Sequence, residues 1–171
     1  MSCALTQGYT LGCCDSVGGV PEVRFIEFNN VTAITAAAGV VSAITTAAAT
    51  KFWRYQLPKQ TSQFTQTDNA SEENGTIFYQ QDLQIVLNKM TATLRNELLL
   101  LGRNRLMAIV SDRNGAFWLL GSRNGMYLST GIAQTGTAMG DRNGYDVTFT
   151  GMEEIPMLSV SPGIIAALTN V

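Results

Sequence analysis

The stretch 111-SDRNGAFWLLGSRNGMYLSTG-131 contains Arg-Asn-Gly twice, ten residues apart, and a third copy follows in 140-GDRNGYDVTFTG-151. Each copy leads into aromatic and β-branched residues, which favour strands. Asn-Gly is the preferred pair for tight hairpin turns, because both residues accept positive φ. We therefore predict hairpin turns at Asn114 and Gly115, at Asn124 and Gly125, and at Asn143 and Gly144. The spacing is unequal, which indicates repeated turn chemistry and not a solenoid.

Short strands are predicted on both sides of these turns. Alternating or β-branched runs indicate strands at 22–31, 39–45, 105–111, 116–122, 126–131, 145–151 and 155–160. The aromatic stretch 51–67 is interrupted by Pro58, which marks a break or an edge. The segments 68–75 and 131–141 are polar or small-residue runs, and we expect both to be loops.

The longest predicted strand is 76-TIFYQQDLQIVLNKM-90. Apolar side chains occupy most of its odd positions and polar side chains most of its even positions, which is the period of a strand. Some of its residues also fit helical spacing, but the alternating pattern is longer. We therefore expect a strand, part of which extends past the body as a hairpin arm or barrel wall.

A single helix is predicted over 91–102. Leu94, Leu98 and Leu101 share one face, Thr91 or Thr93 can cap its start, and Gly102 lies where a C-terminal cap belongs. The fold class is therefore mainly β, an antiparallel sandwich or barrel with one short α-helix. We divide the chain into an N-terminal arm (1–20), a β domain (21–160) and a C-terminal tail (161–171). The apolar tail is expected to dock on a partner or on the subunit's own body.

The composition points away from enzymes. Charged residues make up 14% of the chain, the net charge is -2 and there is no histidine. Without histidine the commonest general base and metal ligand are missing, so we expect no catalytic residues, no cofactor and no metal. A weakly charged surface fits either a tolerant small β protein or a chain buried in contacts with other subunits.

Nucleic-acid and membrane binding are also not expected from the residues. The chain has no basic block that would neutralise phosphates in a groove. The uncharged stretch 31–50 is long enough to cross a membrane, but alanine and threonine dominate it, so we expect strands and loops there and no membrane insertion. The N-terminus lacks the basic and apolar regions of a signal peptide.

The order of these features resembles the tail tube proteins of bacteriophages, and more loosely the inner tube proteins of contractile injection systems. The resemblance lies in 82-DLQIVLNKMTATLRNELLLLGRNRLMAIVSDRNGAFWLLGSRNGMYLSTG-131 followed by 140-GDRNGYDVTFTGMEEIPMLSV-160, and it covers roughly 20–160. A long strand leads to a short helix, then to an Asp-x-Asn-Gly hairpin, and then to Asp-x-Asn-Gly-Tyr-x-x-Thr-Phe. These motifs are structural and carry no catalytic signature.

The resemblance implies a virion structural protein. Such proteins form rings, usually hexamers, that stack into a hollow tail tube whose inner barrel joins the sheets of neighbouring subunits. Viral DNA passes through the lumen during ejection without specific binding, and the helix packs on the outside. The expected partners are other copies of the chain and other tail proteins, in a virion tail made in the cytoplasm of the bacterial host.

Two sets of residues are assigned to this assembly as hypotheses. Polar side chains of the long strand are expected to face the channel, namely Gln80, Asp82, Gln84 and Asn88. Their apolar neighbours on that strand, Ile77, Leu83, Ile85 and Leu87, are expected to face the helix and the outer layer. The loop 68–75, with Asp68, Glu72 and Glu73, is expected to contact the adjacent ring.

Two alternatives remain open at this point. The first is another tail ring of similar fold, such as a terminator, a distal ring or a connector. The second is a monomeric β-sandwich recognition module that stacks a ligand such as a sugar on aromatic side chains, which would be Trp53, Tyr55, Trp118 and Tyr127. Trp118 and Tyr127 lie in strands with apolar neighbours, which favours a core or interface role for them.

Overall fold

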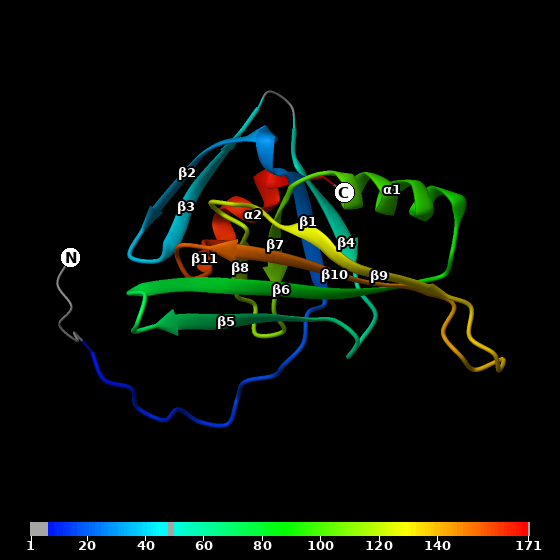
Figure 1. Ribbon diagram of the computed structural model, residues 1–171, viewed down its shortest axis with the longest axis horizontal. Coiled ribbons are helices and arrows are strands. Elements are labelled where there is room, and N and C mark those ends of the chain that lie inside the picture. Colours follow the sequence, from blue (N-terminus) through cyan, green and yellow to red (C-terminus); the bar gives the residue numbers. More distant parts are fainter. Residues whose placement is uncertain (1–6, 48–49, 171) are drawn as a thin grey trace.

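The protein folds into two β-sheets whose strands cross, as Figure 1 shows for β6 in front of β1 and β7. The structure is a computed structural model that describes residues 7–47 and 50–170. The larger sheet is curled and has eight strands in the order β12-β4-β1-β7-β8-β11-β3-β2. These strands are β1 (Glu22–Glu27), β2 (Val31–Ala37), β3 (Val40–Thr46), β4 (Phe52–Gln56), β7 (Leu106–Ser111), β8 (Phe117–Leu120), β11 (Leu158–Val160) and β12 (Thr169–Asn170).

The smaller sheet has four strands in the order β5-β6-β10-β9, and all of its pairs are antiparallel. Its members are β5 (Gln63–Ser71), β6 (Thr76–Asn88), β9 (Tyr127–Gln134) and β10 (Gly144–Glu153). Two helices, α1 (Ala92–Arg103) and α2 (Pro162–Leu168), and a 3-10 turn (Phe28–Asn30) complete the chain. The predicted mainly antiparallel β fold is confirmed, although β11 with β3 and β12 with β4 are parallel pairs.

The predicted helix is confirmed, but it is not the only one. The Thr91 side chain accepts a hydrogen bond from the backbone N–H of Leu94 and caps the start of α1, as expected. Gly102 lies inside the helix, which ends at Asn104 as its C-cap, so the predicted glycine cap is wrong. The backbone at Gly102 lies close to β9, since an added Cβ would approach the Leu128 side chain to 2.9 Å.

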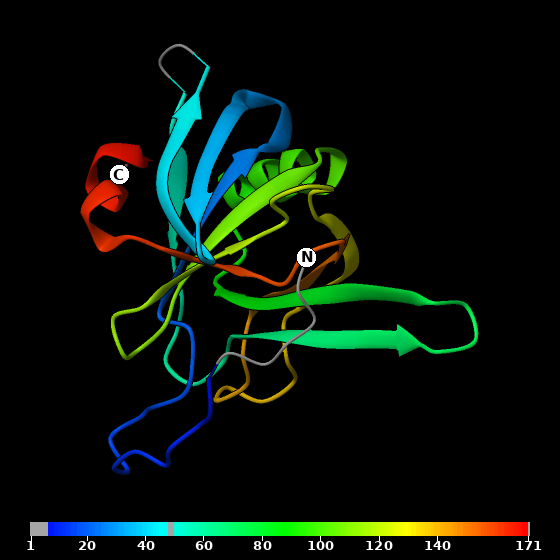
Figure 2. The ribbon, with the colours of Figure 1, turned by 90° about the vertical axis from the view of Figure 1, so that its left-hand side faces the viewer.

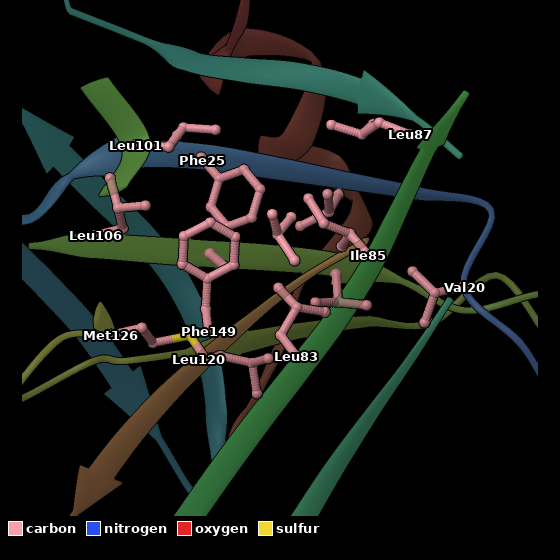
Figure 3. Packing of buried hydrophobic residues seen from close by; sticks show 14 residues of the cluster. Val20, Phe25, Leu83, Ile85, Leu87, Leu101, Leu106, Leu120, Met126 and Phe149 are labelled. Carbon is pink, nitrogen blue, oxygen red and sulfur yellow. The ribbon is translucent and has the colours of Figure 1, made fainter. Parts of the chain in front are cut away.

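The main core lies between the two sheets and α1 (Figure 3). Strand β7 is buried on both faces, because a second cluster packs on its other side. Leu106, Ala108 and Val110 point into the first cluster, and Met107 and Ile109 into the second. A strand that is buried on both faces has a nearly continuous apolar sequence. The segment 105–111 shows this pattern.

The C-terminal tail docks on the body of its own subunit. Helix α2 buries Ile165 in the second core cluster, and β12 pairs with β4. The Arg24 guanidinium, which is buried, donates a 3.1 Å hydrogen bond to the Thr169 hydroxyl. The seven residues of α2 are too few to show a periodic pattern, so the sequence prediction missed this second helix.

The first Asn-Gly pair forms a hairpin turn between β7 and β8, as predicted. The turn is not the two-residue type, however. Ser111 pairs with Phe117, which leaves five residues in the loop, and only Gly115 there has a positive φ, of 81°. The Asp112 carboxylate holds the loop by accepting 2.8 Å hydrogen bonds from the backbone N–H groups of Asn114 and Ala116.

The second pair, Asn124 and Gly125, does not join two paired strands, so the predicted meander is wrong at this point. Strand β8 belongs to the larger sheet and β9 to the smaller one, and the turn carries the chain between the sheets. Gly125 has a φ of 72°, and an added Cβ would lie 2.7 Å from Cγ of Arg105. Glycine is therefore needed here for both its φ and its size.

The third pair lies at the start of β10 and not at the tip of a turn. Strands β9 and β10 do form the predicted hairpin, but β9 continues to Gln134, so the expected loop 131–141 shrinks to 135–143. Gly144 pairs with Asn88 of β6, and a Cβ at this position would lie 2.1 Å from the carbonyl oxygen of Leu87. The glycine here permits close approach to the neighbouring strand.

Candidate functional site

The exposed face of the four-stranded sheet carries mostly polar side chains, with exposed apolar ones at Phe78, Met152 and Ile132. Strand β6 alternates over its second half as predicted: Leu83, Ile85 and Leu87 are buried in the core, while Gln80, Asp82, Gln84 and Asn88 lie on the opposite face, where they are partly or fully exposed. The prediction is wrong for Ile77, which is 56% exposed because it lies in the part of β6 that extends past β10. The helical alternative for this segment is wrong. The register places threonines of β5, β9 and β10 beside these residues, namely Thr65, Thr67, Thr130, Thr148 and Thr150.

Hydrogen bonds across the strands order the carboxylates of this face. The Thr150 hydroxyl donates to Oδ1 of Asp82 at 2.6 Å, and the Gln80 amide donates to Oδ2 of the same carboxylate at 2.8 Å. The Gln84 amide donates to Asp146 at 3.1 Å, and the Arg142 guanidinium lies 3.5 Å from that carboxylate. Both acids are thus held by neutral or cationic donors, and the face presents a fixed, weakly acidic surface.

Both edges of this sheet are open and carry almost no charge. Strand β9 is exposed at all eight positions and contains no charged residue, and β5 contains only Asp68. Tyr127 and Ile132 on β9 are 56% and 51% exposed. Edge strands of monomers are usually protected by charged side chains, prolines or bulges, since bare edges pair with other chains. Neither edge has a proline, although β9 carries a bulge where its register shifts against Thr148 and Phe149. Because both edges are open and almost uncharged, they are still suited to strand pairing.

The predicted inter-ring segment lies at the tip of a projecting hairpin, as expected for an extended strand, but its turn is shorter than predicted. Strand β5 continues to Ser71, so residues 68–71 are strand, and only 72–75 form the turn. Strand β10 ends opposite Tyr79, which itself pairs with Asp68. Residues 69–78 therefore extend about 10 Å beyond the sheet at roughly 3.3 Å per residue. Figure 2 shows this hairpin standing out from the body. Glu72 and Glu73 in its turn are exposed.

A buried carboxylate connects this sheet to the turn that enters it. Glu153, the last residue of β10, is 1% exposed and accepts 2.9 Å hydrogen bonds from the backbone N–H groups of Arg123 and Asn124. Burial raises the pKa of this carboxyl above its ordinary value, and the backbone donors and Arg105 oppose part of that rise. The neighbouring Glu154 is exposed.

The structure does not gather the four aromatic residues of the recognition-module alternative into one platform. Trp53 and Tyr55 line a groove of about 450 Å³ between β4 and α1. Tyr127 lies on the β9 edge and Trp118 on β8 beside Val110, in the other sheet. Burial, with a smaller effect of Glu97, raises the pKa of Tyr55 to about 12, which keeps this phenol neutral.

Two further classes of site were searched in the described part of the chain. Within residues 7–47 and 50–170, no three acidic, cysteine or histidine side chains come together as metal ligands. Among the same residues, neither helix has the length and apolar character needed to cross a bilayer. The uncharged segment that invited a membrane assignment forms β2 and β3, apart from residues 48 and 49, which lie outside the described residues.

Comparison of the chain with models of protein families, with curated proteins and with solved structures finds no match.

Proposed function

We propose that this protein is the subunit of a bacteriophage tail tube, in which rings of the chain stack and enclose a channel for DNA. The observation that carries the proposal is the four-stranded sheet, which combines two bare edges with a polar face. A sheet of this kind is incomplete as a monomer, because its edge groups and its apolar edge residues have no partners.

The strand directions allow the sheet to close into a barrel. Each neighbouring pair in the order β5-β6-β10-β9 is antiparallel, so β5 and β9 run in opposite directions. Rotation about an axis along the strands leaves the direction of β5 unchanged in the next copy. The β9 edge of one subunit then meets the β5 edge of the next as an antiparallel pair, and repetition of this contact gives a closed ring. From the resemblance to tail tube proteins we expect six subunits.

The polar face suits the wall of a channel through which DNA slides. The core side of the sheet is covered by the larger sheet and α1, so the face with Gln80, Asp82, Gln84 and Asn88 would line the lumen. Strands β5, β6, β9 and β10 contain no lysine or arginine. Proteins hold DNA chiefly by neutralising phosphates with these residues. The Arg142 guanidinium beside this face is paired with Asp146, so the wall offers phosphates little to bind.

The projecting hairpin suits a contact between stacked rings. The turn 72–75 lies at one end of the sheet, whereas loop 135–143 and Lys89 lie at the other, where Asn88 pairs with Gly144. Strands that run along the channel would point the hairpin of one ring at the opposite end of the next. Glu72 and Glu73 would approach the end that carries Lys89 and Arg142.

The proposal is tested by the mass of the purified protein in solution. Light scattering coupled to gel filtration is expected to show species of about six times the 18.4 kDa monomer mass, or larger. Hydrogen exchange should then show protection of the backbone of β5 and β9 in the assembled protein only. Rings that form but never stack would favour a terminator or connector. A monomer at all concentrations, with β5 and β9 unprotected, would overturn the proposal.

A further inference from the structure

An apolar groove runs between α1 and the β9 edge. It has a volume of about 270 Å³ and is lined by side chains from both elements, among them Leu98, Leu99 and Leu128. Leu99 is 44% exposed and Leu128 37% exposed. The groove therefore opens at the edge of the four-stranded sheet, where the next subunit of a ring would lie.

The N-terminal arm carries apolar side chains that its own body leaves exposed. Tyr9 is 88% exposed and Leu11 84% exposed. The hydrogen bonds that hold the arm to the body lie further along the chain. The Asn114 side-chain amide accepts from the Val17 N–H at 2.8 Å and donates to the Val17 carbonyl at 3.0 Å. The N–H of Val20 donates to the Ser62 carbonyl at 3.3 Å. Ser62 immediately precedes β5, so the arm leaves the body at the β5 edge.

The direction of the arm takes it away from its own groove. In Figures 1 and 2 the arm runs on the side of β5 that faces away from β6, with β6 and β10 between it and β9. In a ring closed through β5 and β9, the strand next to β5 is β9 of the neighbouring subunit, about 5 Å away. The open groove beside the root of the arm is then the neighbour's groove.

We propose that the N-terminal arm of each subunit inserts Tyr9 and Leu11 into the groove between α1 and β9 of the next subunit in the ring. This inference rests on the proposed ring and adds a second contact to its strand pairing. Val17 lies six positions after Leu11 in the sequence. An extended chain spans up to about 20 Å over six residue steps, which is enough to cross one strand and enter the groove.

The charges of the two surfaces agree with this pairing. Asp15 is the only charged residue in the sequence 1–20. Of the described residues that line the groove, only Arg95 is charged, and its side chain is exposed. An exposed ion pair of this kind contributes little affinity, but it fixes which end of the arm meets which end of the groove.

Disulfide crosslinking tests the contact, because Cys13 and Cys14 of the arm are exposed and unbonded. The probe is Leu99→Cys in a Cys3→Ser background, and the matched control is Val40→Cys on β3, which is 45% exposed against 44% for Leu99. Mild oxidation of assembled protein should link Leu99→Cys subunits into dimers and higher multimers on non-reducing gels. Val40→Cys should give none, and Cys13→Ser with Cys14→Ser should abolish the multimers.

The outcomes separate this inference from the proposed function. Rings that form without crosslinks, or that show only disulfides within one chain, would overturn the arm contact and leave the ring intact. A protein that forms no rings would overturn both. A second variant, Tyr9→Ala with Leu11→Ala, removes exposed side chains that the monomer fold does not use. It should raise the concentration needed for ring formation at least tenfold, and an unchanged concentration would overturn the inference.

Discussion

The carboxylate of Glu153 accepts a 2.9 Å hydrogen bond from the backbone N–H of Asn124, which lies 29 residues earlier in the chain. It accepts a second bond, also of 2.9 Å, from the N–H of Arg123. These bonds tie the end of β10 to the turn that carries the chain from the larger sheet into β9. Together with the two backbone hydrogen bonds between Leu106 and Met126, this buried acid fixes the start of β9, whose edge is the proposed subunit contact.

Replacement of this acid should weaken the fold and change its pH dependence. Glu153→Gln removes one of two acceptor oxygens, which costs about 1–3 kcal/mol of unfolding free energy. Because the pKa of the folded carboxyl lies above its ordinary value of 4.5, the folded protein binds this proton more tightly than the unfolded chain. Stability due to this group therefore falls as the pH rises from 4.5 through the folded-state pKa.

Urea unfolding of the wild type, Glu153→Gln and Glu154→Gln between pH 4 and pH 7 measures both effects. The difference between the wild type and Glu153→Gln should shrink as the pH rises through that window. Glu154 is exposed, so Glu154→Gln should follow the wild type throughout. A difference for Glu153→Gln that does not change with pH would contradict this account of the turn.

The turn itself should tolerate no side chain at Gly125. An alanine there would adopt a φ of 72° and place its Cβ 2.7 Å from Cγ of Arg105 and 3.1 Å from the Phe28 ring. Gly115 provides the matched control, since its φ is 81° but nothing lies within 4 Å of an added Cβ. Both alanine variants lose about 1–3 kcal/mol from backbone strain, and Gly125→Ala should lose clearly more. Equal melting temperatures for the two variants would contradict the packing described for this turn.

A charge on the bare edge should block assembly without unfolding the subunit. Ile132 on β9 is 51% exposed, and Ile132→Lys places on this strand the residue that natural edge strands use against pairing. We expect the unfolding free energy of Ile132→Lys to lie within about 0.5 kcal/mol of the wild type. Light scattering should show that this variant no longer forms rings. Val40→Lys, also at an exposed apolar position but in the larger sheet, should still form rings. Normal ring formation by Ile132→Lys would remove β9 from the subunit interface.

The projecting hairpin can be shortened without a change of strand register. Deletion of 70–73 together with 76–77 leaves Asn74 and Gly75 as a two-residue turn between Asn69 and Phe78, which already pair. The variant should fold and form rings, because strands β5 and β9 keep their edges. It should fail to stack, since the overhang that reaches the next ring is lost. Tubes of unchanged length in electron micrographs would show that this hairpin makes no contact between rings.

The sequence predicts the elements that have one buried face better than those at the edges. Strand β6 was predictable because its apolar side faces the core, so burial itself produces the alternating pattern. The last residues of β9 read as a loop, since this strand is exposed throughout and forms only by pairing with β10. The polar face of the candidate site followed from the same alternation in β6.

The order of the strands within the sheets could not be predicted from local sequence patterns. Asn124 and Gly125 indicate a turn, but the partner that decides where the turn leads is Glu153, far along the chain. The two open edges of the smaller sheet are a consequence of that order. They could therefore not be located from local patterns, and the proposed subunit contact could be inferred only from the fold.

Negative-stain electron microscopy of the purified protein at rising concentration tests the central claim most directly. The account predicts hollow rods or stacked rings of uniform width, whose number grows with concentration. Featureless small particles at every concentration, together with a monomer mass by light scattering, would contradict it.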